Sequence, residues 1–326
     1  MRTTRVQPMV EGGILSAVAI LFALISVYVP FIGVFVNLIW PVPIILLGVR
    51  HGYKWSLMAT VVAGILIAIL VHPLHAVSVA IGFGLIGIVL GHCFRKGYTP
   101  VTSVLLGSVA SLISKIIVLS VTAAVLNINP LADHTEAMAK AVDQAINLYR
   151  NFGLKEAELA QVAESMKGML SMMKLILPAG FAMASVVDTY LNFLVARAVL
   201  RKLGHHIAAF PAFSVWSFTP KILYAFIISM LLMYWGKSRE IGMMADAGLN
   251  LQVISSMLLM LQGVSVAFFY AGRYEVPKFL RWIFVMMAFT NGFIMQAVVF
   301  VGAFDIAIDF RKLRRQVPPE NMDTGE

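Results

Sequence analysis

The sequence has little charge and almost no cysteine for its length. Only 13% of its 326 residues are charged, and 60% are hydrophobic, whereas a soluble domain has about 25% charged and about 45–50% apolar residues. The single cysteine, Cys93, excludes an internal disulfide framework and a metal site built from several thiolates. This composition is typical of a protein that is solvated mainly by lipid.

The usual motifs of enzymes are also missing. The sequence contains no Walker A loop, no GxSxG nucleophile elbow and no HExxH zinc motif. His72 and His75 flank a proline, and no acid or cysteine near them in the sequence completes a zinc site. We therefore expect no enzyme activity, no cofactor and no bound metal. Because the Walker A loop is missing, the chain is not expected to hydrolyse ATP itself. If it transports a solute, the energy would come from an ion gradient or from a partner ATPase module.

The basic residues are not arranged for nucleic-acid binding. The formal net charge is +9, but Lys and Arg lie in short clusters between apolar runs. This arrangement is typical of the cytoplasmic loops of membrane proteins. We therefore expect the lipid bilayer as the main partner, and no nucleic acid.

The apolar runs approach the length of about 20 residues that crosses a bilayer. They lie near residues 10–29, 34–49, 55–71, 76–92, 101–126, 175–199, 222–235, 251–270 and 282–304. The second run contains Pro41 and Pro43, and because proline removes a helix hydrogen bond we expect a kink or a late start there. The sequence thus predicts an all-α fold, a polytopic transmembrane helix bundle of eight to nine spans.

One long polar segment, residues 128–174, interrupts the apolar runs. Asp133 followed by Glu136 fits a helix N-cap, apolar residues follow at helical spacing, and Gly153 is placed to end that helix. We expect an extracytoplasmic pair of amphipathic helices between spans five and six. The predicted organisation is a six-span core (1–200) with this insert (128–174), a cytoplasmic or interfacial linker (201–220), a C-terminal membrane unit of two to three spans (221–310), and a basic then polar tail (311–326).

The positions of Lys and Arg predict the orientation. With a cytoplasmic N-terminus, the short outer links at 30–33 and 72–75 hold no Lys or Arg, so we expect a multi-pass protein of the bacterial cytoplasmic (inner) membrane. The basic tail opposes this rule, because nine full spans leave it outside. Either the charge bias is overridden at the C-terminus, or the last run breaks near Asn291 and re-enters the side it came from. The uninterrupted apolar length of that run favours nine spans.

Two charges inside apolar runs are the strongest functional signal. At a rise of 1.5 Å per residue, Lys115 lies about 21 Å, and Asp188 about 16 Å, from the inner ends of spans five and six. Because a lone charge at this depth is costly, the two are expected to form an ion pair or to share an ionic solute. Ser111 and Asn192 extend the same polar stripe. We predict Lys115, Asp188, Asn192 and Ser111 as a substrate site; an ion pair that only fixes helix register is the alternative.

Three further polar residues are expected to have structural roles. Glu11, just before span one, either neutralises a basic loop residue or lies at the helix N-terminus, and we expect the second arrangement. Gln262 and Asn291 are candidates for hydrogen bonds between helices, which contribute about 0.6–2 kcal/mol each in membranes.

Several short stretches resemble a known family. They are Glu11-Gly12-Gly13, Gln262-Gly263-Val264-Ser265-Val266, Phe304-Asp305-Ile306 and Asp309-Phe310-Arg311-Lys312, together with Pro41-x-Pro43 and residues 211–216. On these the chain looks like the YybS-like family of bacterial integral membrane proteins, whose function is uncharacterised. Residues 1–200 also show a faint resemblance to the S component of energy-coupling-factor (ECF) vitamin transporters. The insert and three further apolar runs depart from that second pattern.

The leading prediction is an integral membrane protein that binds or transports a small solute through an S-component-like core, with a partner membrane protein or ATPase module as a further expected contact. The alternative is a non-transporting scaffold or assembly factor that recruits partners through basic cytoplasmic loops. The two predict different surroundings for Lys115 and Asp188. A solute site requires a cavity that opens beneath the insert, whereas a scaffold predicts a sealed, dry ion pair.

Overall fold

A computed structural model describes residues 6–29, 32–153 and 155–313, and over these residues the chain is nearly all helical, with no strand. The all-α prediction is therefore confirmed. The chain divides into two compact units, residues 1–174 with 180–209 and residues 175–179 with 210–326. The change of unit at 209/210 falls inside the segment expected to be a linker.

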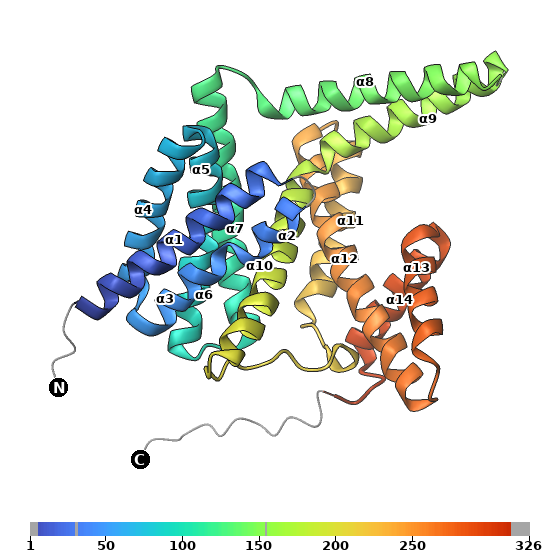
Figure 1. The fold of residues 1–326 in the computed structure, drawn as a ribbon. Coiled ribbons are helices and arrows are strands. Elements are labelled where there is room, and N and C mark those ends of the chain that lie inside the picture. The colour runs from blue at the N-terminus through green and yellow to red at the C-terminus, as the bar shows by residue number, and fades with distance from the viewer. Residues whose placement is uncertain (1–5, 30–31, 154, 314–326) are drawn as a thin grey trace. The chain divides into compact units, whose positions relative to one another are not determined.

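Most helices follow one another with short connections, whereas residues 203–220, after the tenth helix, contain no α-helix (Figure 1). The helices from the N-terminus to residue 202 are α1 (Val6–Tyr28), α2 (Ile32–Ile39), α3 (Pro41–His51), α4 (Tyr53–Leu70), α5 (Pro73–Gly82), α6 (Gly84–Lys96), α7 (Pro100–Leu126), α8 (Pro130–Asn151), α9 (Glu156–Leu175) and α10 (Leu177–Lys202). The second unit contains the 3₁₀ turn η1 (Phe213–Val215), α11 (Lys221–Ser238), α12 (Gly242–Arg273), α13 (Lys278–Thr290) and α14 (Gly292–Ile308).

The described residues contain six helices long and apolar enough to cross a membrane, or seven if the bent pair α13–α14 counts as one span. This is fewer than the eight to nine spans expected. The second predicted span is divided into α2 and α3, of 8 and 11 residues. Pro41 and Pro43 lie in the first turn of α3, where a missing N–H donor costs nothing. The seventh predicted span corresponds to α11. This helix has only 18 residues, with Lys221 and Lys237 near its ends, and is not among the six.

The last apolar run is not one straight helix. α13 and α14 are bent by 107° at Asn291. The Oδ1 of Asn291 accepts hydrogen bonds from the backbone nitrogens of Phe293 (3.0 Å) and Ile294 (3.2 Å). Asn291 therefore caps α14, and the expectations of an interhelical bond and of an unbroken final span were both wrong. An N-cap residue adopts an extended backbone, here φ −116° and ψ 114°, and this ends α13.

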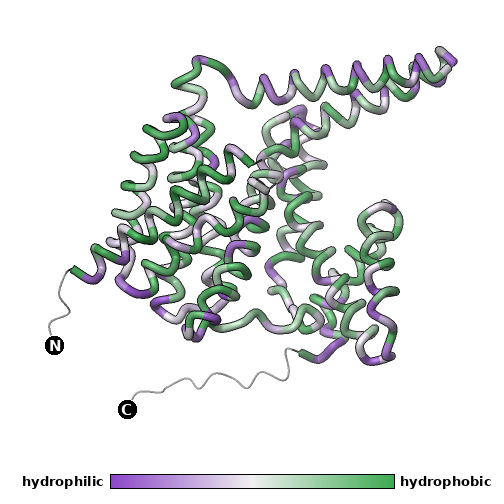
Figure 2. Tube along the Cα trace, viewed as in Figure 1, coloured by the Kyte–Doolittle hydropathy of each residue, from purple (hydrophilic) through white to green (hydrophobic). Residues whose placement is uncertain are grey.

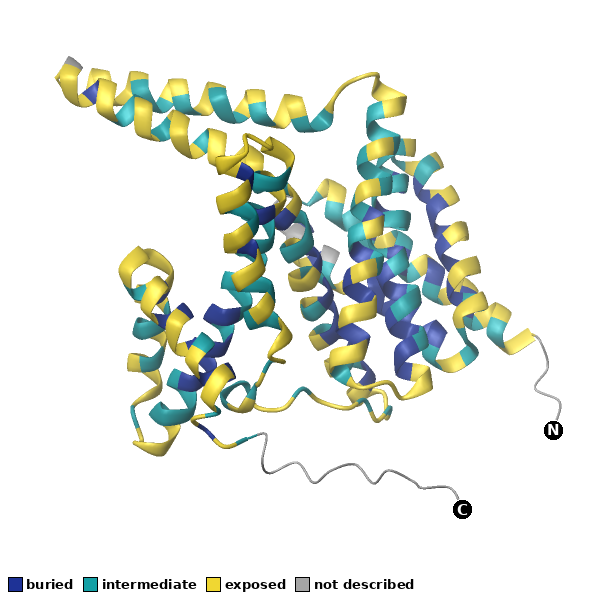
Figure 3. Cartoon of the chain, turned by 180° about the vertical axis from the view of Figure 1, so that it is seen from behind, coloured by how far each residue is buried: buried dark blue, intermediate teal, exposed yellow. Residues whose placement is uncertain are grey.

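Small residues form the contact between α1 and α4 in the core of the first unit. Ala19 and Ala23 of α1 are buried in one cluster with Ala59 and Ala63 of α4, and Figure 3 shows the buried residues on the inward faces of these helices. Small side chains let membrane helices approach closely, which strengthens their van der Waals contact. At the α3–α6 crossing a Cβ on Gly91 would lie only 3.0 Å from the carbonyl oxygen of Ile45, so a larger residue would have to push the two backbones apart by a few tenths of an ångström.

The predicted helix pair of the insert is α8 and α9. α8 begins at Pro130, and its N-cap is Asn129, four residues before the Asp133 that was expected in this role, because the side chain of Asn129 accepts from the nitrogen of Ala132 (3.2 Å). α8 turns aside from α7 (Figure 1), none of its residues is buried, and polar and apolar residues alternate along it (Figure 2). On its exposed surface, a hydrogen bond from Lys140 lowers the pKa of the Glu136 carboxyl.

The second unit is organised around α12, which packs against α11 and α14. Two glycines set the distance between α12 and α14. A Cβ on Gly302 would overlap the carbonyl oxygen of Leu259, and a Cβ on Gly263 would overlap that of Val298. The two backbones therefore touch, which brings Gln262 of α12 within hydrogen-bonding distance of Asp305 of α14.

Candidate functional site

The two intramembrane charges of the sequence analysis lie in contact. The Nζ of Lys115 on α7 donates to Oδ2 of Asp188 on α10 at 2.5 Å and to Oγ of Ser111 at 2.8 Å. Ser111 is buried one turn before Lys115. The predicted ion pair is thus confirmed, and the hydroxyl of Ser111 helps to position the ammonium group of Lys115.

Close packing sets the register of α10 so that Asp188 faces Lys115. Gly107 of α7 lies against Thr189, and a Cβ on this glycine would overlap the methyl group of Thr189. The rings of Phe94 on α6 and Phe193 on α10 meet edge to face, with centroids 5.2 Å apart. Because both contacts fix α10 along its length, the neighbouring Asp188 is held at the level of Lys115.

Lys115 and Asp188 open into a pocket of about 330 Å³. Its walls are Ser78, Gly82, Phe83, Ile86, Lys115, Val118, Leu119, Thr122, Pro130, Phe181 and Asp188. The side chains of Lys115 and Asp188 are 25% and 38% exposed. Pro130 is the first residue of α8, so the pocket reaches the foot of the insert. Mostly apolar walls with a few convergent polar groups are typical of small-molecule sites.

Asn192 lies behind this pocket and does not line it. Its Nδ2 donates to the backbone oxygen of Asp188 at 2.8 Å, and the residue is only 1% exposed. Its Oδ1, like Oγ1 of Thr189, is buried without a hydrogen-bond partner among the described residues. Four residues along a helix is a shift of about 6 Å along the axis, which places Asn192 beyond the pocket wall. The expected direct contact of Asn192 with a solute is therefore not supported by its position.

Glu11 neutralises basic residues, which is the arrangement that we did not expect for it. Its Oε2 accepts from Nη1 of Arg50 at 3.3 Å and lies 3.0 Å from Nε2 of His51. α1 begins at Val6, so Glu11 is in the second turn and neutralises the basic end of α3 instead of capping α1. Within the described part of the chain, no three His, Cys, Asp or Glu side chains are grouped to hold a metal ion.

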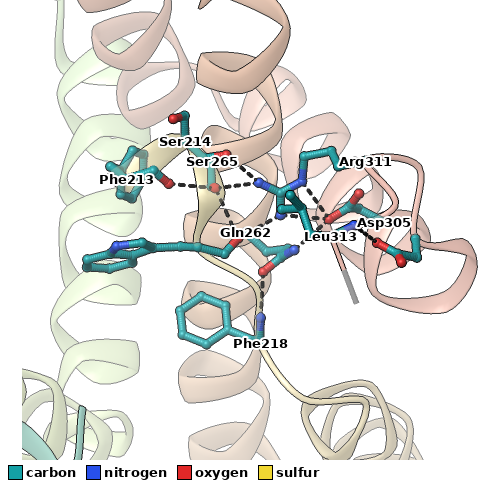
Figure 4. A network of polar contacts seen from close by, with 10 residues as sticks. Phe213, Ser214, Phe218, Gln262, Ser265, Asp305, Arg311 and Leu313 are labelled. Atoms are coloured by element: carbon teal, nitrogen blue, oxygen red, sulfur yellow. Dashed lines mark hydrogen bonds and ion pairs between the residues drawn. The ribbon is translucent and has the colours of Figure 1, made fainter. Parts of the chain in front are cut away.

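The second unit contains a buried ion pair (Figure 4). Oδ2 of Asp305 accepts from Nε and Nη2 of Arg311 at 3.2 and 2.9 Å, and the side chains are 3% and 0% exposed. The guanidinium also donates to Ser265 Oγ (2.8 Å) and to the carbonyl oxygens of Ser214 (2.7 Å) and Trp216 (2.6 Å). A single arginine thereby joins α12, α14 and the 213–218 segment.

Gln262 completes this network. Its Nε2 donates to Oδ2 of Asp305 at 2.6 Å, and its Oε1 accepts from the backbone nitrogen of Phe218 at 3.0 Å. The predicted interhelical hydrogen bond of Gln262 is confirmed. Oδ1 of Asp305 is buried, with no partner among the residues that the structure describes. The network uses backbone groups of a loop, which suits a structural role.

The burial of Arg311 was not expected, because the sequence places this residue at the start of a predicted basic tail. The left-handed backbone of Asp309 (φ 55°) ends α14, and Arg311 then lies inside the unit. One signal in the sequence could have predicted this burial. Asp305 is a single acid at the end of an apolar run, and such an acid requires a cation nearby. The other predicted tail arginines, from residue 314 on, lie outside the described residues.

Comparison with known proteins finds a family but no established activity. A family model described as "Predicted membrane protein (DUF2232)" matches residues 17–306. The uncharacterized protein YybS of Bacillus subtilis (strain 168) is 25% identical over 314 residues, which cover 95% of this chain and 99% of that protein. The resemblance to the YybS-like family is thus confirmed. No solved structure matches the chain, and the likeness of residues 1–200 to ECF S components stays a prediction.

Proposed function

The chain belongs to the DUF2232 family of predicted membrane proteins, and on that premise we propose that it binds a small zwitterionic or anionic solute in the Lys115–Asp188 pocket, as a step of transport. We place it in the bacterial inner membrane with a cytoplasmic N-terminus. The observation that carries the proposal is that this ion pair opens into a pocket.

A partly exposed ion pair between two apolar helices needs a polar neighbour. Facing hydrocarbon, each charge would cost about 2.5–3.5 kcal/mol or more, so the exposed parts of Lys115 and Asp188 favour a pocket filled by water or by a polar solute. A solute that carries both signs of charge can replace each group's partner. Its cationic group would bind Asp188 and its anionic group Lys115, so no charge would be left unpaired.

The broken helix beside the pocket supports an anionic group on the solute. α5 ends at Gly82 and α6 begins at Gly84, within one candidate span. Gly82, Phe83 and Ile86 line the pocket, and no side chain caps α6. The N-terminal end of a helix carries a partial positive charge, and interrupted helices that point such ends at anionic groups are common in transporter sites. The pocket volume of about 330 Å³ suits a molecule at the small end of typical ligands.

The solute site is tested by thermal denaturation of the purified full-length protein with amino acids and carboxylated vitamins. We expect at least one of these compounds to raise the Tm of the wild type and to have no effect on Asp188→Asn. Asp143→Asn, which removes the same charge from the exposed surface of α8, should keep the full shift. A compound set that never distinguishes Asp188→Asn from the wild type would remove the support for transport.

The orientation follows from the Lys and Arg distribution and has its own test. We expect a cysteine at Ala137, exposed on α8, to react with a membrane-impermeant maleimide in intact cells. A cysteine at Lys96, at the end of α6, should react only after permeabilisation. The native Cys93 is buried, so it adds little background. The opposite labelling pattern would place the N-terminus outside.

A membrane scaffold is the second candidate function. Arg201 and Lys202 are exposed at the end of α10, and such basic residues suit the recruitment of an acidic partner. This alternative predicts that no solute changes the Tm through Asp188. The same thermal experiment therefore separates the two functions.

A further inference from the structure

A second pocket lies wholly within the second unit, beside a cluster of basic residues. It has a volume of about 250 Å³ and is formed by the end of α12, the following loop and the start of α13. Its walls are Ala267, Phe268, Tyr270, Ala271, Tyr274, Val276, Leu280, Arg281 and Phe284. We propose that this pocket binds an anionic phospholipid, with an acyl chain along the apolar wall and the phosphate at the basic rim.

The rim supplies the charge that an anionic headgroup needs. Arg273, Lys278 and Arg281 occur within nine residues, with Glu275 as the only acid among them. Arg273 and Lys278 are exposed and therefore free to reach a headgroup. The local net charge is +2, from three bases and one acid. Basic pockets between membrane helices are known to bind the headgroups of anionic lipids.

Arg281 is held in the wall of the pocket by backbone groups. Its Nε donates to the carbonyl oxygen of Val276 at 2.9 Å, and its Nη2 donates to that of Ala271 at 3.1 Å. No acid among the described residues pairs with this guanidinium, and none of those residues accepts a bond from its Nη1. A half-buried cation without a counter-ion is stabilised by an anion that binds beside it. The first turn of α13 adds backbone N–H groups, since no side chain caps that helix.

The wall of the pocket suits a lipid chain better than a soluble anion. Phe268, Leu280 and Phe284 give it an apolar surface. The rings of Tyr270 and Tyr274 are stacked, with centroids 6.5 Å apart and an angle of 21° between planes. Tyrosines are enriched at the level of lipid headgroups, where the ring is in an apolar and the hydroxyl in a polar environment. The apolar wall, the tyrosines and the bases thus supply the kinds of contact that the acyl chain, the interfacial region and the headgroup of a phospholipid each require.

Native mass spectrometry of the full-length protein, with phosphatidylglycerol or phosphatidylcholine added, tests this site. We expect the wild type to retain phosphatidylglycerol selectively. The double variant Arg273→Gln/Lys278→Gln should weaken this binding about tenfold, since each base near an anionic membrane surface contributes severalfold. The matched control Lys237→Gln/Arg239→Gln removes two exposed bases at the C-terminal end of α11 and should leave binding unchanged.

A second variant tests the acyl part of the site. Ala271→Phe fills the pocket and leaves the basic rim intact, so we expect it to weaken phosphatidylglycerol binding as well. The proposal is overturned if phosphatidylcholine binds as tightly as phosphatidylglycerol, or if the control double variant loses as much binding as the rim variant. It is also overturned if glycerol 3-phosphate, which lacks acyl chains, binds as tightly as the lipid, because the site would then recognise a free phosphate. None of these outcomes depends on the solute pocket of the first unit.

Discussion

Arg311→Met is expected to lower the free energy of unfolding by about 3–5 kcal/mol. The substitution leaves the carboxylate of Asp305, which is 3% exposed, without its cation. The carbonyl oxygens of Ser214 and Trp216 each lose the bond from Arg311, although that of Trp216 keeps the bond from Ser265 Oγ (3.1 Å). Because the side chain of Arg311 is fully buried, water cannot replace these bonds without opening the unit. Chemical unfolding of the purified protein, followed by tryptophan fluorescence, measures the change.

Three companion variants identify the cause. Arg311→Lys should recover only part of the loss, since one ammonium cannot donate in all the directions that a planar guanidinium reaches. The double variant Arg311→Met/Asp305→Leu should be more stable than Arg311→Met, because it removes the unpaired charge. Lys312→Met changes the exposed neighbouring base and should have little effect. An Arg311→Met protein as stable as Lys312→Met would show that the buried network contributes nothing.

Lys115→Met is expected to destabilise the protein by about 2–3 kcal/mol, somewhat less than the loss of a fully buried ion pair. The Asp188 carboxylate would lose its partner, but its side chain is 38% exposed and retains some contact with the pocket. Replacing both residues, as Lys115→Met/Asp188→Leu, should cost less than Lys115→Met alone. Unfolding in a detergent titration gives the free energies of the single and double variants.

The coupling between the two changes is the informative quantity. Residues in one ion pair give a double-mutant coupling energy of about 0.5–3 kcal/mol, whereas independent residues are additive. The exposed pair Glu136–Lys140 on α8, with a distance of 2.8 Å, is the matched control and should be close to additive. If the effects of Lys115→Met and Asp188→Leu on the free energy of unfolding were additive as well, the contact would have no energetic consequence in the membrane.

Part of the candidate site could be predicted because its signal is local. A charge inside an apolar run is visible without any neighbour, so Lys115 and Asp188 were found as a pair. Their contact was expected because spans five and six are successive and antiparallel, and because the two charges lie at similar depths in them. The pocket could not be predicted in the same way. It depends on the break at Phe83 and on the position of Pro130 at the foot of the insert, which periodicity does not reveal.

The positions of Asn192 and Glu11 show the limit of sequence spacing. Asn192 shares a helix face with Asp188, but the close contact of Gly107 with Thr189 turns that face into a packed interface beyond the pocket. Glu11 was assigned to its own helix end, whereas Arg50 and His51 of α3 lie beside it in the structure. In both cases a residue on another helix decides the role, and spacing along one helix carries no information about it.

The sequence by itself determined the class of this protein, because the length of an apolar run and the scarcity of charge are properties of single segments. It also predicted the helical insert and the Lys115–Asp188 pair. Only the tertiary structure decided that Asn291 breaks the last run and that Arg311 is buried against Asp305. The reason is physical. The partner of a polar group is set by which backbones approach closely, here through Gly263 and Gly302, and that approach is a property of two helices together.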